Sequence, residues 1–153
     1  GRRLGYLVGP ARLIAEVQAL RRLMFRHTPN NNQRTVARFL ALGHYDTMVH
    51  RLHRAYRARW QAMNEALTRH LPGSFEQPSF GGSSFWVHGP EGLDTEALDR
   101  RARARGVLIE PGRIFFFSEN PPTNYFRLAF SSVASERIEP GIRILADLIH
   151  DRA

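Results

Sequence analysis

The sequence predicts an α+β fold, and three observations support this class. The chain has 153 residues, 42% of them hydrophobic and 24% charged, which is typical of a globular domain that buries a sizeable core. The first half carries apolar residues mainly at helical spacing. The second half alternates short apolar segments with two helical patterns, which predicts a small sheet covered by helices.

The first segment predicts a short strand followed by a helix. Residues 4–8 have strand character and end at Gly9-Pro10, and Pro10 suits the first turn of a helix. One apolar face then continues through about Phe25. Its members recur at steps of helical period: Leu13, Ile14, Val17, Leu20 and Met24.

Two further helices are predicted before residue 75. Asn31 or Asn32 is expected to cap a short helix that ends at Gly43. Asp46 is expected to cap the longest helix, which Pro72-Gly73 terminates. The apolar stripe of that helix has steps of three or four throughout: Val49, Leu52, Tyr56, Trp60, Met63, Leu67 and Leu71.

The second half predicts four strands and two helices. Strands are expected at 84–87, 107–109, 114–117 and 125–130, the last with alternating faces. A helix over 93–105 has Asp94 as its cap and ends at Gly106. The last helix runs to about residue 151. Because an internal proline breaks a helix, its first turn is placed at Pro140 with Glu139 as cap.

The core of this half is expected to come from apolar residues of the strands and helices. They are Phe85, Val87, Leu98, Leu108, Ile109, Phe126, Leu128, Ile142 and Leu145. A compact unit is therefore predicted over residues 75–153. The first strand and two helices resemble part of something larger, since one strand cannot make a sheet and their apolar faces need partners.

Composition limits the chemistry that this chain performs. It has no cysteine, so disulfides and thiolate metal sites are excluded. It also has no lysine, so no lysine Schiff base, general base or phosphate-loop lysine exists in it. Neither a signal peptide nor an apolar run of membrane-spanning length is recognisable, and we expect a cytoplasmic protein.

The strong positive charge raises nucleic-acid binding as a hypothesis. The formal net charge is +8 and the pI about 11.2. All 22 basic residues are arginine, which indicates a general replacement of lysine rather than a binding adaptation. The run of arginines between 100 and 105 is interpreted as a solvated helix end that complements the helix dipole.

Arg127 is the most informative candidate site residue. It lies in the middle of the strand at 125–130, on the face opposite Phe126 and Leu128. A planar guanidinium in this position suits a carboxylate held by two hydrogen bonds. The alternative is an arginine on a solvated sheet face. Arg3 has the same ambiguity, between gripping a phosphate and flanking the first strand.

Histidine offers a weaker hypothesis of a metal site. His50 and His53 are three residues apart on one predicted helix, a spacing that two metal ligands can use. No third ligand at motif spacing accompanies them, because their neighbours are Arg51, Arg54 and Arg57. Solvated helix histidines are favoured, and no metal is expected.

Several segments together resemble fold-type I aminotransferases, which depend on pyridoxal 5'-phosphate. Residues 3–10, Arg-Leu-Gly-Tyr-Leu-Val-Gly-Pro, resemble the strand that follows the cofactor lysine. Glu110-Pro111-Gly112 with Phe115 resembles the turn after a small-domain strand. The segment 126–132 resembles the strand that bears the substrate-carboxylate arginine, and Glu136 to Leu145 resemble the terminal helix.

One branch of this superfamily is favoured, the MocR-type regulators, in which a GntR-type winged helix is fused to an aminotransferase domain. Gly43-His44-Tyr45-Asp46 and the motifs at 50–54 and 56–59 resemble the long interdomain helix of that branch. The resemblance implies that residues 1–45 are a remnant of the large cofactor domain, 46–74 the interdomain helix and 75–153 the C-terminal small domain.

The resemblance also implies roles for particular residues. Arg3 matches the arginine that contacts the cofactor phosphate, and Arg127 matches the arginine that binds the substrate carboxylate. The loop 27–32 matches a stretch near the dimer interface that can approach the partner's cofactor, so a homodimer is expected. The Schiff-base lysine, and with it any catalytic residue, is expected upstream of Gly1.

Three functional hypotheses follow. The first is a fragment of an effector domain that binds pyridoxal 5'-phosphate and an amino-acid-like ligand in a DNA-binding regulator, where DNA is bound through an upstream winged helix. The second is a fragment of a free-standing aminotransferase, in which case the parent is an enzyme although this fragment alone is not. The third is a basic nucleic-acid-binding domain.

Overall fold

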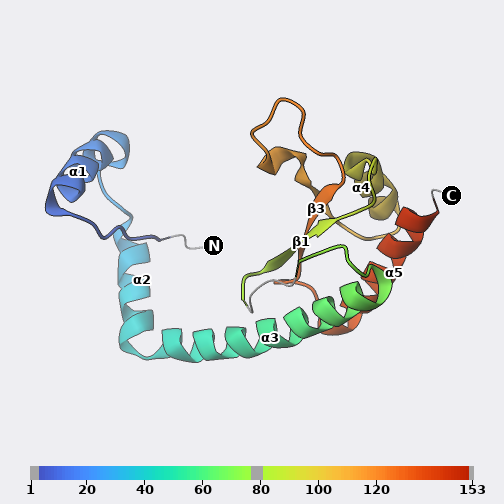
Figure 1. Ribbon diagram of the computed structural model, residues 1–153. Coiled ribbons are helices and arrows are strands. Elements are labelled where there is room, and N and C mark those ends of the chain that lie inside the picture. The colour runs from blue at the N-terminus through green and yellow to red at the C-terminus, as the bar shows by residue number, and fades with distance from the viewer. Residues whose placement is uncertain (1–3, 77–80, 152–153) are drawn as a thin grey trace. The chain divides into compact units, whose positions relative to one another are not determined.

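The computed structural model describes residues 4–76 and 81–151 (Figure 1). The chain divides into two compact units, a first unit of residues 1–51 and a second unit of residues 52–153. The division falls within the longest helix, α3 (His44–His70). Along the described part of the chain, no helix has both the length and the apolarity to cross a membrane.

The first unit consists of α1 (Ala11–Phe25), α2 (Asn30–Ala41) and the start of α3. No residue of α1 or α2 is buried. The strand predicted at 4–8 is wrong: residues 4–10 have no regular structure. A strand forms only against a hydrogen-bonding neighbour, and the described residues provide none for this segment.

Helix starts in the first unit differ from the sequence prediction. The cap of α2 is Pro29, whose carbonyl accepts from the amides of Asn32 and Gln33, and not Asn31 or Asn32. The longest helix begins at His44, so Asp46 lies in its first turn instead of capping it. A carboxylate there still favours the helix, because the N-terminal end of the dipole is positive.

The second unit is a three-stranded antiparallel sheet with helices. It contains β1 (Ser84–His88), α4 (Thr95–Ala104), β2 (Glu110–Pro111), the 3-10 helix η1 (Gly112–Phe115), β3 (Tyr125–Ala129) and α5 (Ser135–His150). The strand order is β1-β3-β2, so β3 is central. The predicted strands at 84–87 and 125–130 and the Asp94 cap of α4 are confirmed; Asp94 accepts from the amides of Glu96 and Ala97.

Helices cover one face of this sheet. Phe85 and Val87 of β1 and Phe126 and Leu128 of β3 are buried, as the period of two predicts. They join one apolar cluster with residues of α3, α4 and α5, among them Met63, Leu67, Leu98, Ile142 and Leu145. Figure 1 shows α5 running beside the C-terminal half of α3. The opposite face of the sheet carries Trp86 and Arg127.

Two predicted strands are wrong for local reasons. Residues 107–109 are irregular because the Val107 amide donates to the Ala102 carbonyl and so closes the end of α4. Strand β2 therefore begins only at Glu110, and Leu108, predicted for the core, is exposed. Residues 114–117 form no strand either, since Gly112–Phe115 wind into η1.

The last helix starts earlier than predicted. It begins at Ser135 after Ala134, so Pro140 lies inside α5 and Glu139 is not its cap. Proline there removes one hydrogen bond, the one that its amide would donate to the Glu136 carbonyl. The extra turn buries Ile138, which lies on the same face as Ile142. Burial of a large aliphatic side chain offsets the lost bond.

Candidate functional site

The candidate site is centred on Arg127, in the middle of the central strand. Its register partners are Trp86 on β1 and Glu110 on β2. Because side chains alternate along a strand, these three residues share the face that the helices leave uncovered. The Arg127 side chain is 40% exposed, which leaves it accessible to a ligand.

Glu110 holds the guanidinium from one side. Arg127 Nε and Nη2 each lie 2.5 Å from Glu110 Oε2, and the glutamate side chain is 38% exposed. The pair joins the central strand to the two-residue edge strand. Since solvent reaches both groups, its contribution to stability is modest, on the order of 1 kcal/mol or less. Its stronger effect is on the orientation and net charge of the site.

One aromatic ring lies over the arginine, and other rings pack next to it. The Phe115 ring centroid lies 5.8 Å from Arg127 Cζ, within cation-π range. Phe115 meets Trp86 edge-on at 5.5 Å between centroids, and Trp86 stacks on Tyr125 at 5.8 Å. These contacts order the neighbours of the guanidinium and shield one side of it from water.

A glycine allows the turn beside the site. A Cβ built on Gly112 would lie 2.6 Å from the Tyr125 carbonyl oxygen and 2.8 Å from Trp86 Cη2. Only a residue without a side chain permits this close approach. The turn thereby keeps Glu110 and Phe115, on either side of Gly112, next to Arg127.

An open groove of about 620 Å³ lies next to Arg127 and Glu110. Its walls are the segment 106–110, the end of β3 with the following loop, and one face of α5. Most of the lining is apolar, and its charged side chains are Glu110, Arg127 and Arg137. An apolar groove with a guanidinium fork suits a small ligand that has a carboxylate and an apolar body.

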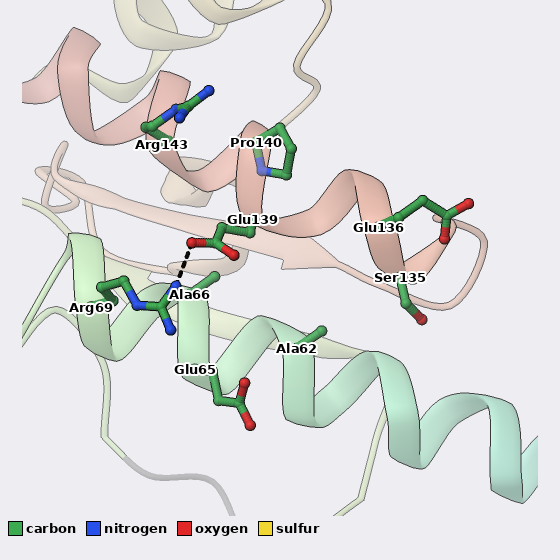
Figure 2. Close-up of a pocket in the computed structure, with 9 residues that line it drawn as sticks. All are labelled: Ala62, Glu65, Ala66, Arg69, Ser135, Glu136, Glu139, Pro140 and Arg143. Carbon is green, nitrogen blue, oxygen red and sulfur yellow. Dashed lines mark hydrogen bonds and ion pairs between the residues drawn. The ribbon is translucent and has the colours of Figure 1, made fainter.

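Figure 2 shows a second pocket, of about 440 Å³, between α3 and α5. Arg69 Nη1 and Glu139 Oε1 lie 2.5 Å apart there, and His70 Nε2 lies 3.3 Å from the same oxygen. Hydrogen bonds from His70 and from Arg69 hold the pKa of Glu139 below its usual value. The ion pair joins helices α3 and α5, and the side chains that line this pocket do not form an arrangement suited to catalysis.

The other predicted site residues lie away from this groove or outside the described ranges. Arg3 lies outside the described residues. His50 and His53 lie on α3, and within the ranges 4–76 and 81–151 no three His, Asp or Glu side chains gather to hold a metal ion. Sequence reasoning missed Glu110 as the partner of Arg127. An acidic residue just before a predicted turn was the available signal, but only the strand register pairs the two.

Pyridoxal 5'-phosphate, the cofactor that the resemblance implies, does not fit this chain as a covalently held group. Its attachment needs a lysine amine, and the 153 residues contain none. What the described residues offer is the donor set for an anionic ligand group at Arg127.

Comparison with known proteins places the chain. No family model matches it. The HTH-type transcriptional regulator TauR of Rhodobacter capsulatus is 49% identical over 146 residues, which are 95% of this chain and 30% of that protein. The chain thus spans about a third of the length of the relatives that it matches.

Two solved aminotransferases share the fold. The multiple substrate aminotransferase of Thermococcus profundus has a TM-score of 0.82 and 31% identity, covering 92% of this chain and 35% of that one. LysN, the α-aminoadipate aminotransferase of Thermus thermophilus, solved with N-(5'-phosphopyridoxyl)-L-leucine, has a TM-score of 0.79 and 33% identity over 95% and 37%. The fold, the order of elements and these identities show that the chain belongs to the fold-type I aminotransferase-like proteins, and its 49% identity to TauR relates it to the MocR-type transcriptional regulators.

Proposed function

We propose that this chain is the C-terminal part of the effector domain of a GntR/MocR-type regulator. In the intact protein that domain binds pyridoxal 5'-phosphate and an amino-acid-like ligand, and an upstream winged helix binds DNA. The observation that carries the proposal is the much higher identity to the regulator TauR than to the two aminotransferases.

The parts of the chain have different roles in this proposal. Residues 1–45 belong to the large cofactor domain, 46–74 to the interdomain helix and 75–153 to the small domain. Arg3 contacts the cofactor phosphate, and the Schiff-base lysine precedes this chain. The apolar side chains that α1 and α2 leave exposed, such as Leu20, support burial of this region against the rest of the protein and a second subunit.

Arg127 binds the ligand carboxylate. Its central position in the sheet, its exposed guanidinium and the adjoining apolar groove support this role. The phosphopyridoxyl-leucine complex of LysN supports an amino acid joined to the cofactor as the kind of ligand that such a fold accommodates. A carboxylate on two guanidinium N–H groups forms charge-assisted hydrogen bonds, which are among the stronger contacts that a ligand makes.

The test uses the intact gene product, loaded with pyridoxal 5'-phosphate. Amino acids are titrated while the cofactor absorbance and the affinity for DNA upstream of the gene are followed. We expect at least one amino acid to change both signals. Arg127→Gln should retain the cofactor and weaken the amino-acid response about tenfold or more, since it removes a charge-assisted pair.

The second candidate function is a free-standing aminotransferase, which the two solved structures favour. It predicts amino-group transfer to a 2-oxo acid and no specific DNA binding. An intact protein that catalyses transfer and ignores DNA would establish this function in place of the regulator. An Arg127→Gln protein with an unaltered ligand response would remove Arg127 from the site in either case.

A further inference from the structure

We propose that Glu110 determines which class of ligand Arg127 accepts. It disfavours plain mono- and dicarboxylates and favours a carboxylate that is accompanied by an ammonium group on the same small molecule. The inference rests on the proposed role of Arg127 as the carboxylate-binding residue and adds a specificity-determining residue to it.

The hydrogen-bond geometry leaves one edge of the guanidinium open. Arg127 Nε–H donates to Glu110 Oε2 at a nitrogen–oxygen distance of 2.5 Å, and Arg127 Nη2 forms an ion pair with the same oxygen, also at 2.5 Å. Among the described residues, that side chain forms no other hydrogen bond or ion pair. The outer edge of the guanidinium, with one Nη1 hydrogen and the Nη2 hydrogen that points away from Glu110, is the fork that a carboxylate binds with two parallel bonds.

The charge of the pair decides what that fork attracts. Arg127 and Glu110 together are neutral. A ligand carboxylate is therefore attracted by the guanidinium and repelled by the Glu110 carboxylate on the other side of that guanidinium. An ammonium group on the ligand offsets this repulsion, because Glu110 attracts it. A second carboxylate increases the repulsion. Glu110 thus acts as an internal carboxylate that lowers the affinity for simple anions.

Besides the pair, the groove lining carries one charged side chain, Arg137 on α5. Its positive charge is the same in the wild type and in the variants compared below, so it does not change their order. On the face of the sheet that carries the pair, the neighbouring side chains Phe115 and Trp86 are apolar and add no charge. Exposures of 40% and 38% mean that solvent screens the repulsion, so we expect an effect of about three- to tenfold in affinity rather than an all-or-none change.

Glu110→Gln separates charge from orientation. The amide oxygen of glutamine still accepts from Nε, so the guanidinium keeps its position while the negative charge is removed. Glu139→Gln is the matched control: it removes one negative charge from an ion pair with Arg69, in the pocket of Figure 2, outside the groove lining. Both variants change the net charge of the chain equally.

The experiment follows the Arg127 Nε–H resonance of the ¹⁵N-labelled intact gene product, assigned by its loss in Arg127→Gln. Propionate, succinate and β-alanine are titrated into the wild type and both variants at constant ionic strength. In Glu110→Gln, the Kd for propionate should fall about three- to tenfold and that for succinate further. The Kd for β-alanine should change less, because its ammonium loses Glu110 as a partner. Glu139→Gln should leave all three unchanged.

The outcomes separate the two proposals. If propionate and β-alanine gain equally in Glu110→Gln, or if Glu139→Gln gives the same gain, Glu110 does not select the ligand class. If the Kd values stay at their wild-type level, its charge has no role in binding. If no ligand moves the Arg127 resonance in any protein, Arg127 is not an anion site, and the proposed role on which this inference rests fails.

Discussion

Replacing Gly112 by alanine tests how the turn positions the site. The new Cβ would lie 2.6 Å from the Tyr125 carbonyl oxygen, a backbone atom of the central strand, and 2.8 Å from Trp86 Cη2. Since a strand backbone yields little, the turn must move away from β3 and carry Glu110 away from Arg127. Overpacking of this kind costs about 2 kcal/mol. With a urea m-value of about 2 kcal/mol/M, the midpoint should fall by about 1 M.

The matched control is Gly141→Ala in α5, where no atom outside the helix backbone lies within 4 Å of the position that the new Cβ would take. There alanine should raise stability by about 0.5–1 kcal/mol, because it lowers the conformational entropy that folding removes. Urea unfolding followed by circular dichroism measures both changes. The Arg127 Nε–H resonance should shift in Gly112→Ala alone. Equal midpoints for the two variants, or an unshifted resonance in Gly112→Ala, would refute the close-approach argument.

Three further predictions concern the core, the ion pairs and the first unit. Phe126→Ala, at a fully buried position of the central strand, should cost about 3–5 kcal/mol and lower the thermal midpoint of the second unit. The pKa of Glu139 in the folded chain lies below its usual value of 4.5, so the stability that this carboxylate contributes is present above pH 4.5 and is lost as the pH falls through the folded pKa. The difference in unfolding free energy between the wild type and Glu139→Gln should therefore vanish in acid, which urea unfolding at a series of pH values measures. The isolated chain should self-associate, because α1 and α2 bury no residue and expose large apolar side chains; a strictly monomeric chain in sedimentation at high micromolar concentration would contradict this.

The alternation of apolar residues was enough to locate the central strand. Phe126 and Leu128 are buried and Arg127 is on the other face, as the period of two requires. The Asp94 cap was equally local, because a capping side chain bonds amides only two and three residues away. These features depend on near neighbours in the chain, which the sequence displays directly.

Elements that depend on distant partners were predicted less well. Residues 4–8 have strand composition but no strand to pair with among the described residues, and residues 107–109 lose their strand to the closing bond of α4. The compact second unit includes the part of α3 from Leu52 onward, because Met63 and Leu67 of α3 belong to its core. The composition of a segment gives its propensity for strand or helix, but a strand forms only where another segment supplies hydrogen-bonding partners.

The sequence by itself determined the α+β class, the apolar faces, the absence of a Schiff-base lysine and the candidacy of Arg127. Only the tertiary structure paired Arg127 with Glu110, seventeen positions earlier in the chain, and placed Phe115 and Trp86 beside them. The register of three antiparallel strands and the close turn at Gly112 bring these residues together. Local spacing does not encode the register, because a shift of one residue in β1 or β2 would send Trp86 or Glu110 to the opposite face of the sheet.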